Sequence, residues 1–221
     1  MKRAISAILL AGAALTAAAQ TEETSFNGWG VRVGLDISIP GNWTFDNGNS
    51  VDMYKNGAGF TAGVVYNLPL VSELYFEPGL SMFYDTYAYK DLIVTDEPGE
   101  VVDTDPSIRK FGLRLPLMFG YRFNVFNGFS FSVYTGPELS YAISGKIGMK
   151  NPEAWGDISD LTLFGKNGGY RRFDCGWKIG IGFPIGRWFC GVEGSFGLLD
   201  MHKNDVSFHE NRVSVSFGYD F

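Results

Sequence analysis

Charged side chains occur on one face of several segments in which polar and apolar residues alternate along the chain. The two signs are nearly balanced there, and charges held away from bulk water must pair to offset the cost of desolvation. We therefore expect an internal network of ion pairs, with a charge-lined conducting pore as the alternative. The candidate members are Arg32, Asp36, Glu77, Asp85, Arg114, Arg122, Glu138, Asp174, Lys178, Glu193 and Asp220. The expected centre consists of Arg114, Arg122, Glu77, Glu138, Lys178 and Glu193.

A second group with potential chemistry lies near the end of the chain, where His202 and His209 flank Asp205 and Ser207. Histidine with carboxylate or hydroxyl partners can bind a metal or activate a serine in a membrane acyltransferase. No nucleophile-elbow motif accompanies these residues, and two widely spaced histidines are a weak metal signal. We predict polar loop residues here, and we predict no catalytic residue, metal or cofactor.

Acidic side chains dominate the segment 87–107, where Lys90 is the basic counterpart. Carboxylate oxygens can bind calcium, but the spacing here is not that of an EF-hand loop. We therefore expect a solvated acidic loop. Its acidic residues are Asp91, Asp96, Glu97, Glu100, Asp103 and Asp105.

The segments that position the charged face have the periodicity of β-strands. In the first of them, Trp29, Val31 and Val33 alternate with Gly30 and Arg32. Successive side chains of a strand point to opposite faces, so this pattern gives one apolar and one polar face. The same alternation predicts eight strands, at residues 29–39, 57–68, 74–85, 111–123, 129–143, 172–183, 188–198 and 212–221.

The connections between these strands alternate strictly between short and long. The short ones are 69–72, 124–128 and 184–187, and the long ones are 40–56, 86–107, 144–170 and 199–211. Short turns at one rim and long loops at the other are typical of outer-membrane barrels. The predicted fold is all-β: an eight-stranded antiparallel up-and-down transmembrane β-barrel with short periplasmic turns and long extracellular loops.

A soluble eight-stranded barrel of the lipocalin kind is the alternative architecture, and it would turn the apolar face inward. Glycine, with 29 residues in the chain, is concentrated on the polar face, where it makes room in a narrow lumen but gains nothing on a solvated surface. Aromatic residues such as Trp29, Tyr121 and Trp188 lie near strand ends on the apolar face, as in the aromatic girdles of membrane barrels. Both features favour the membrane barrel.

The first residues of the chain indicate export. Lys2 and Arg3 precede an apolar stretch at 4–15, and small residues at 17–19 provide a cleavage site. This stretch is too short for a membrane-spanning helix. We predict a signal peptide at 1–19, a short segment at 20–28 and an outer-membrane β-barrel domain at 29–221. The formal net charge of -6 argues against a nucleic-acid partner.

The two cysteines of the chain lie on neighbouring predicted strands. If the turn 184–187 pairs Phe183 with Trp188, Cys190 faces Ile181, six residues along the strand from Cys175. That offset is roughly 20 Å, too far for a disulfide. We expect two lipid-facing thiols.

Several short motifs resemble the PorT-like family of small bacterial outer-membrane β-barrels. They are LRLPLMFGYRF at 113–123, the TGP step at 135–137, FDCGWKIGIGF at 173–183 and the closing FGYDF at 217–221. The resemblance implies that the barrel-assembly machinery reads the terminal aromatic residues Phe217, Tyr219 and Phe221. The founding member of that family is associated with protein secretion, but no motif here carries that role over.

The expected function follows from the long loops. Loops with many aromatic side chains favour a structural or surface-interaction role, with an unknown protein or surface ligand at the extracellular side. A small pore and an accessory role in a secretion system are the alternatives. The expected partners are outer-membrane lipid and, during insertion, the assembly machinery. The candidate loop residues are Trp43, Phe45, Tyr54, Tyr89, Trp155 and Phe164.

Overall fold

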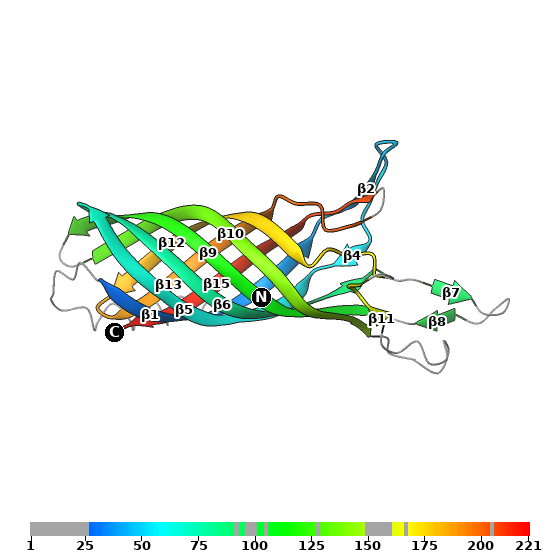
Figure 1. Ribbon diagram of the computed structural model, residues 1–221, viewed down its shortest axis with the longest axis horizontal. Coiled ribbons are helices and arrows are strands. Elements are labelled where there is room, and N and C mark those ends of the chain that lie inside the picture. Colours follow the sequence, from blue (N-terminus) through cyan, green and yellow to red (C-terminus); the bar gives the residue numbers. More distant parts are fainter. Residues whose placement is uncertain are drawn as a thin grey trace.

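The computed structural model describes residues 27–90, 93–95, 101–103, 106–126, 129–148, 161–165, 168–203 and 206–221. Within these ranges, eight long strands form the body of the molecule (Figure 1). The predicted signal peptide at 1–19, Asp205, Trp155 and most of the acidic loop lie outside the described residues. The long strands are β1 (Gly28–Pro40), β5 (Gly57–Val71), β6 (Leu74–Tyr89), β9 (Ser107–Phe126), β10 (Phe129–Gly148), β12 (Phe173–Ile185), β13 (Trp188–Gly197) and β15 (Glu210–Asp220).

The long strands form a closed antiparallel ring. Each pairs with its neighbours in chain order, and β1 closes the ring against β15, with Val31 opposite Tyr219 and Val33 opposite Phe217. The predicted eight-stranded up-and-down barrel is confirmed. Strands β9 and β10 continue past the predicted boundaries at the end where the long loops lie (Figure 1). No helix in the described part of the chain is long and apolar enough to span a membrane.

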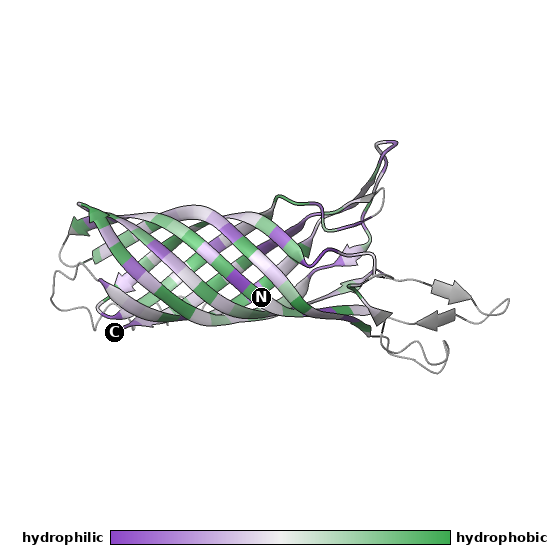
Figure 2. Ribbon diagram, in the orientation of Figure 1, coloured by the Kyte–Doolittle hydropathy of each residue, from purple (hydrophilic) through white to green (hydrophobic). Residues whose placement is uncertain are grey.

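Hydrophobic and hydrophilic residues alternate along the barrel strands (Figure 2), and the large apolar side chains are exposed on the outer surface. Large side chains such as Leu35, Trp29 and Trp188 are more than half exposed there, at 67%, 59% and 59%. The alternating charged and glycine residues point inward, so a soluble barrel with an apolar interior is excluded. Some of those glycines are required by close strand contact: a Cβ on Gly136 would collide with the Leu117 carbonyl oxygen of the neighbouring strand.

The turn between β12 and β13 is tighter than predicted. Ile185 pairs with Trp188, and Gly186 occupies the intervening turn with a φ of 59°, a value that glycine adopts without steric cost. Phe183 therefore faces Cys190, and the predicted pairing of Phe183 with Trp188 is wrong by two residues. The shift moves Cys175 and Cys190 further apart in register, and both are free thiols.

The loop end contains short strands that the sequence pattern did not predict. Three of them, β2 (Trp43–Phe45), β3 (Ser50–Val51) and β14 (Val206–Ser207), form a small separate sheet. Strand β4 (Tyr54–Lys55) pairs with β6, and β11 (Leu161–Thr162) pairs with β10. Strands β7 (Ile93–Thr95) and β8 (Val101–Asp103) form a hairpin. The long connections are therefore partly folded extensions of the barrel.

A hydrophobic core lies at this loop end. It joins residues from the loops to inward-facing residues of the long strands, because the apolar loop side chains have no other water-excluded place to pack. We call this set the mouth core. Its buried members are Tyr54, Phe83, Tyr87, Ile108, Ala142, Leu163, Phe164, Tyr170, Met201 and Phe208.

Candidate functional site

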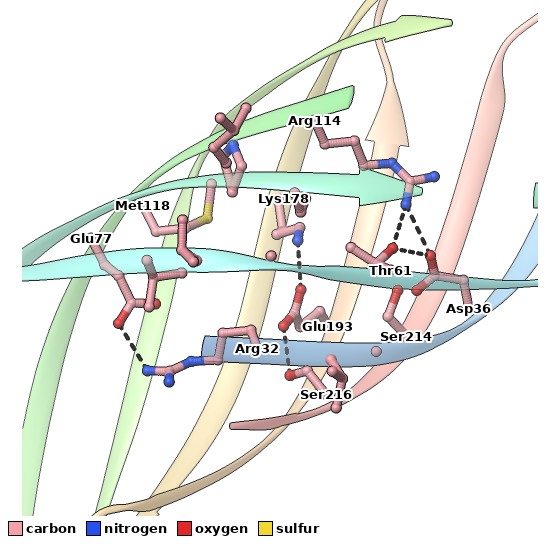
Figure 3. Close-up of a pocket in the computed structure, with 18 of the residues that line it drawn as sticks. Arg32, Asp36, Thr61, Glu77, Arg114, Met118, Lys178, Glu193, Ser214 and Ser216 are labelled. Carbon is pink, nitrogen blue, oxygen red and sulfur yellow. Dashed lines mark hydrogen bonds and ion pairs between the residues drawn. The ribbon is translucent and has the colours of Figure 1, made fainter. Parts of the chain in front are cut away.

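The centre of the lumen is held by Arg114, which projects from β9 across the barrel. Its guanidinium donates to Asp36 of β1 at 2.9 Å and to the Thr61 hydroxyl of β5 at 2.6 Å (Figure 3). Arg114 also forms an ion pair with Asp85, and Thr61 donates to Asp36 at 2.5 Å. Alternation along four strands points these side chains inward, where Arg114 is only 3% exposed.

A second group of charges continues from this centre through Glu138. Its carboxylate accepts from Arg212 of β15 and forms an ion pair with Lys178 at 2.9 Å. Lys178 also pairs with Glu193 at 2.6 Å, and the Ser216 hydroxyl donates to Glu193 at 2.8 Å (Figure 3). Charges from four strands thus fill the middle of the lumen.

A third group lies nearer the short turns. Arg32 pairs with Glu77 at 3.2 Å and with Asp220 at 2.6 Å, and its guanidinium carbon lies 4.4 Å from the centroid of the Phe189 ring. Phe189 faces the lumen rather than the outside, so a cation–π contact accompanies the ion pairs there.

Arg122 does not lie at the centre of the network. It faces Ser132 near the turn end of β9, with its guanidinium 5.8 Å from the centroid of the Tyr75 ring. Arg122 lies eight positions along β9 from Arg114, so the two side chains enter the lumen at different heights along the barrel. The central role of Arg122 stays a prediction.

Three charged residues outside the predicted set, Lys110, Glu210 and Arg212, also lie in the lumen. Lys110 pairs with Glu210 at the loop end, where the Tyr87 hydroxyl also donates to Glu210 at 2.8 Å. Arg212 joins the central group through Glu138. Lys110 continues the polar face of β9 beyond the predicted strand, and Arg212 lies on the polar face of β15, so strict alternation could have found both.

Two small cavities remain between these groups. One of about 70 Å³ lies toward the turn end, and one of about 30 Å³ lies toward the loop end, where Asp174 lines it. Arg114 and Arg212 line both cavities and so lie between them. Volumes of this size hold a few water molecules. Among the described residues, the buried Tyr134 hydroxyl lines the larger cavity without a hydrogen-bond partner, and it is a natural contact for such water.

The mouth core lies beyond the loop-end charges. The hydroxyls of Tyr54 and Tyr170 share a hydrogen bond, Tyr89 reaches Tyr170 at 3.1 Å, and the Trp43 indole donates to Tyr54 at 2.9 Å. Burial raises the pKa of both Tyr54 and Tyr170 above the ordinary value for tyrosine. These hydroxyls therefore remain neutral and act as hydrogen-bonding groups.

Several of the aromatic residues predicted as loop interaction candidates pack inside the loops. Tyr54 and Phe164 are only 3% and 5% exposed, because they fill the mouth core. Trp43 and Tyr89 pack against the same core and are half-buried. Phe45 is exposed at 36% on the small separate sheet.

The histidines of the last loop have structural surroundings. His202 packs against the rings of Trp43 and Tyr170, each with its centroid 5.3 Å away, and burial lowers its pKa. His209 hydrogen-bonds the Leu199 carbonyl oxygen at 3.0 Å and lies 3.4 Å from the Ser207 hydroxyl. Within the described ranges, no three His, Cys, Asp or Glu residues are grouped as metal ligands would be.

Comparison with known proteins places this architecture among bacterial envelope proteins. The model of the family described as "Outer membrane protein beta-barrel domain" matches residues 18–203. No curated protein matches the chain.

Solved structures with a similar fold include Neisserial surface protein A, with 14% identity, a TM-score of 0.46 and coverage of 90% of this chain and 100% of that one. Ail of Yersinia pestis, crystallised with a heparin analogue, has 14% identity, a TM-score of 0.41 and coverage of 87% and 99%. The outer membrane enzyme PagL has 12% identity, a TM-score of 0.42 and coverage of 84% and 99%.

Proposed function

The chain belongs to the outer membrane protein beta-barrel domain family, and from that premise we propose that it is a closed, non-enzymatic barrel with a structural or surface-interaction role. The barrel resides in the outer membrane, with its apolar face in the lipid. In this proposal the lumen is a sealed interior, and contacts with other molecules are made by the folded loop end.

The observation that carries the proposal is the ion-pair network across the lumen. Arg114, Arg212 and Lys178 link acidic groups from several strands into one cluster. Removing one partner of a buried ion pair costs about 3–5 kcal/mol, so spontaneous separation of several pairs is a rare event. An eight-stranded barrel is also only wide enough for its own side chains.

The mouth core supports the same conclusion from the extracellular side. Its buried rings pack over the loop-end charges, so an ion would have to displace both layers. In this proposal, a partner binds the outer surface of the loops. The small sheet contributes Phe45 and Val51 to that surface, at 36% and 43% exposed.

Two partners follow from this proposal. The assembly machinery would read the terminal strand, whose Phe217 and Phe221 are exposed on the lipid face at 46% and 63%, with Tyr219 on the same face. A protein or surface ligand would bind the loops. The resemblance to the PorT-like family remains part of the proposal, and we assign no secretion role from it.

The absence of catalysis is also a proposal. The His209 ring is held by the Leu199 carbonyl oxygen and contacts the Ser207 hydroxyl, and Asp200 accepts hydrogen bonds from the backbone amides of His202 and Phe208 at 3.0 Å each. These contacts suit a folded loop. Ser207→Ala and His209→Gln variants should leave the lipid composition of the outer membrane unchanged.

Single-channel recording in planar bilayers tests the closed lumen. Wild-type protein should pass no steady current, and an Arg114→Ala, Glu138→Ala double variant should show transient or steady conductance. A matched control is the Lys90→Ala, Asp52→Ala double variant, which removes an exposed ion pair outside the lumen and should stay silent. Steady, ion-selective current through the wild type would contradict the proposal and favour a small pore.

A further inference from the structure

Several asparagines of the chain are followed directly by glycine, and in such a pair the asparagine side chain can react with the next backbone nitrogen. Glycine favours the reaction because it has no Cβ to shield that nitrogen. The surroundings of each pair decide whether the backbone is free to turn toward the side chain. Three of these pairs lie within the described ranges: Asn27-Gly28, Asn47-Gly48 and Asn56-Gly57.

Strand pairing restrains two of the three pairs. Gly28 pairs with Asn67 at the start of β1, and Gly57 pairs with Ser38 at the start of β5. A Cβ on Gly57 would collide with the Thr86 carbonyl oxygen, so the backbone there is closely packed. In both pairs the glycine nitrogen can turn toward the preceding side chain only after strand pairing opens.

The third pair lies in the turn between β2 and β3, which projects away from the barrel (Figure 1). Asn47 and Gly48 are both exposed, and a Cβ on Gly48 would have no atom within 4 Å. The Gly48 amide donates to the Phe45 carbonyl oxygen at 2.8 Å, and this bond must open before the nitrogen can react. β2 and β3 share two paired positions, and so short a hairpin opens readily.

The Asn47 side chain is already folded over this turn. Its Oδ1 accepts a hydrogen bond from the backbone amide of Asn49 at 3.0 Å, an arrangement that asparagine favours in turns. Attack on the Asn47 Cγ places negative charge on Oδ1, and a backbone N–H at this distance stabilises such charge. The turn therefore both exposes the pair and supports the reaction.

We propose that Asn47 is a site of spontaneous modification, in which its side chain cyclises onto the backbone and loses ammonia. The Gly48 nitrogen bonds to the Asn47 Cγ, and the Cγ–Nδ2 bond breaks. The amide proton of Gly48 passes through water to the departing nitrogen, which leaves as ammonia. A water molecule then opens the ring at one of its two carbonyl carbons and gives aspartate or isoaspartate.

The modification changes the outer surface of the small separate sheet. It adds a negative charge two positions from the exposed Phe45, and isoaspartate also lengthens the backbone of the turn by one bond. The proposed function assigns a partner to this surface, but the modification itself does not rest on that role.

The test compares the three pairs in one sample of the folded barrel, incubated in detergent micelles at neutral pH. Peptide mass spectrometry with electron-transfer fragmentation measures aspartate and isoaspartate at each position. Asn47 should convert at least roughly tenfold faster than Asn27 or Asn56, because strand pairing must open before those two react. In guanidinium chloride all three should convert at similar rates. Equal rates in the folded barrel would overturn the proposal.

The products and two matched variants test the chemical route. Isoaspartate should appear at position 47, since it forms when the cyclic intermediate opens; aspartate alone would show direct hydrolysis of the side chain and contradict the proposal. Asn47→Gln should abolish conversion at that position, because its longer side chain forms a larger ring far more slowly. Asn56→Gln is the control and should leave conversion of Asn47 unchanged.

Discussion

Arg114 donates to Asp36 at 2.9 Å across the lumen, although 78 positions separate them in the sequence and their strands are not neighbours. Strand β9 pairs with β6 and β10, whereas β1 pairs with β5 and β15. The contact therefore links two strands of the barrel wall that are not adjacent, with β5 and β6 between them. It also lies at the level between the two internal cavities, so the proposed closure of the lumen depends on the same ion pair.

An Arg114→Met variant tests this contact. It leaves Asp85 buried without its guanidinium partner and leaves Asp36 with only the longer ion pair to Arg212 at 3.9 Å, and the free energy of unfolding should fall by about 3–5 kcal/mol. Urea titration of the barrel in lipid vesicles, followed by tryptophan fluorescence, measures the change. An Arg187→Met variant at the exposed turn should change stability by less than 0.5 kcal/mol, within the usual range for a surface substitution. Equal losses in the two variants would show that the contact does not carry this stability.

A Tyr170→Phe variant tests the hydrogen bonds of the mouth core. The Tyr170 hydroxyl contacts the hydroxyls of both Tyr54 and Tyr89, and its loss leaves a buried polar group less satisfied, at a cost of about 1–3 kcal/mol. The loops should open more often while the barrel stays folded. Protease cleavage of the loops should therefore be faster in the variant. Tyr66→Phe, on the outer face beside Trp29, is the control and should leave the rate unchanged.

The burial of His202 predicts a pH dependence of the mouth core. The pKa of folded His202 lies below its ordinary value because burial disfavours the charged ring. The unfolded loop therefore binds more protons than the folded loop as pH falls. The contribution of neutral His202 to stability is complete above about pH 6.5 and is lost progressively below it.

NMR titration in detergent micelles measures this dependence. The His202 ring resonances should titrate below pH 6.5, and the Trp43 indole signal should shift with them because the two rings are 5.3 Å apart. A His202→Gln variant should remove the coupled shift, whereas His209→Gln should retain it. A His202 titration at or above pH 6.5 would contradict the predicted direction.

The barrel was predictable from the sequence because the pattern that indicates each strand lies within a short stretch of neighbouring residues. Because successive side chains of a strand point to opposite faces, the alternation of polar and apolar residues indicates which face of each strand is apolar. The alternation of short and long connections indicates at which rim of the barrel each connection lies. Most inward charges followed from the same rule. Arg212 obeys the same rule, because it lies on the polar face of β15 and pairs with Glu138 in the lumen.

The mouth core was not predictable in the same way. Tyr54, Phe164, Tyr170 and Phe208 come from three different loops with no common periodicity, and only their meeting in space makes them a core. Aromatic residues in a loop indicate either a contact surface or internal packing, and local sequence does not distinguish the two. The predicted register between β12 and β13 was wrong by two residues. The tight turn depends on the positive φ of Gly186, which the alternation of polar and apolar residues does not indicate.

Two strand glycines, Gly136 on the lumen face and Gly194 on the outer face, provide the last prediction. A Cβ at Gly136 would overlap the Leu117 carbonyl oxygen on the neighbouring strand, whereas a Cβ at Gly194 would find its nearest atom 3.9 Å away, on the Phe196 ring. Backbone atoms in a closed ring cannot move aside without breaking strand pairing. Gly136→Ala should therefore lower both refolding yield and stability, and Gly194→Ala should be tolerated. Heat-modified mobility on gels separates folded from unfolded barrels, and normal refolding of Gly136→Ala would show that strand spacing there is looser than this contact implies.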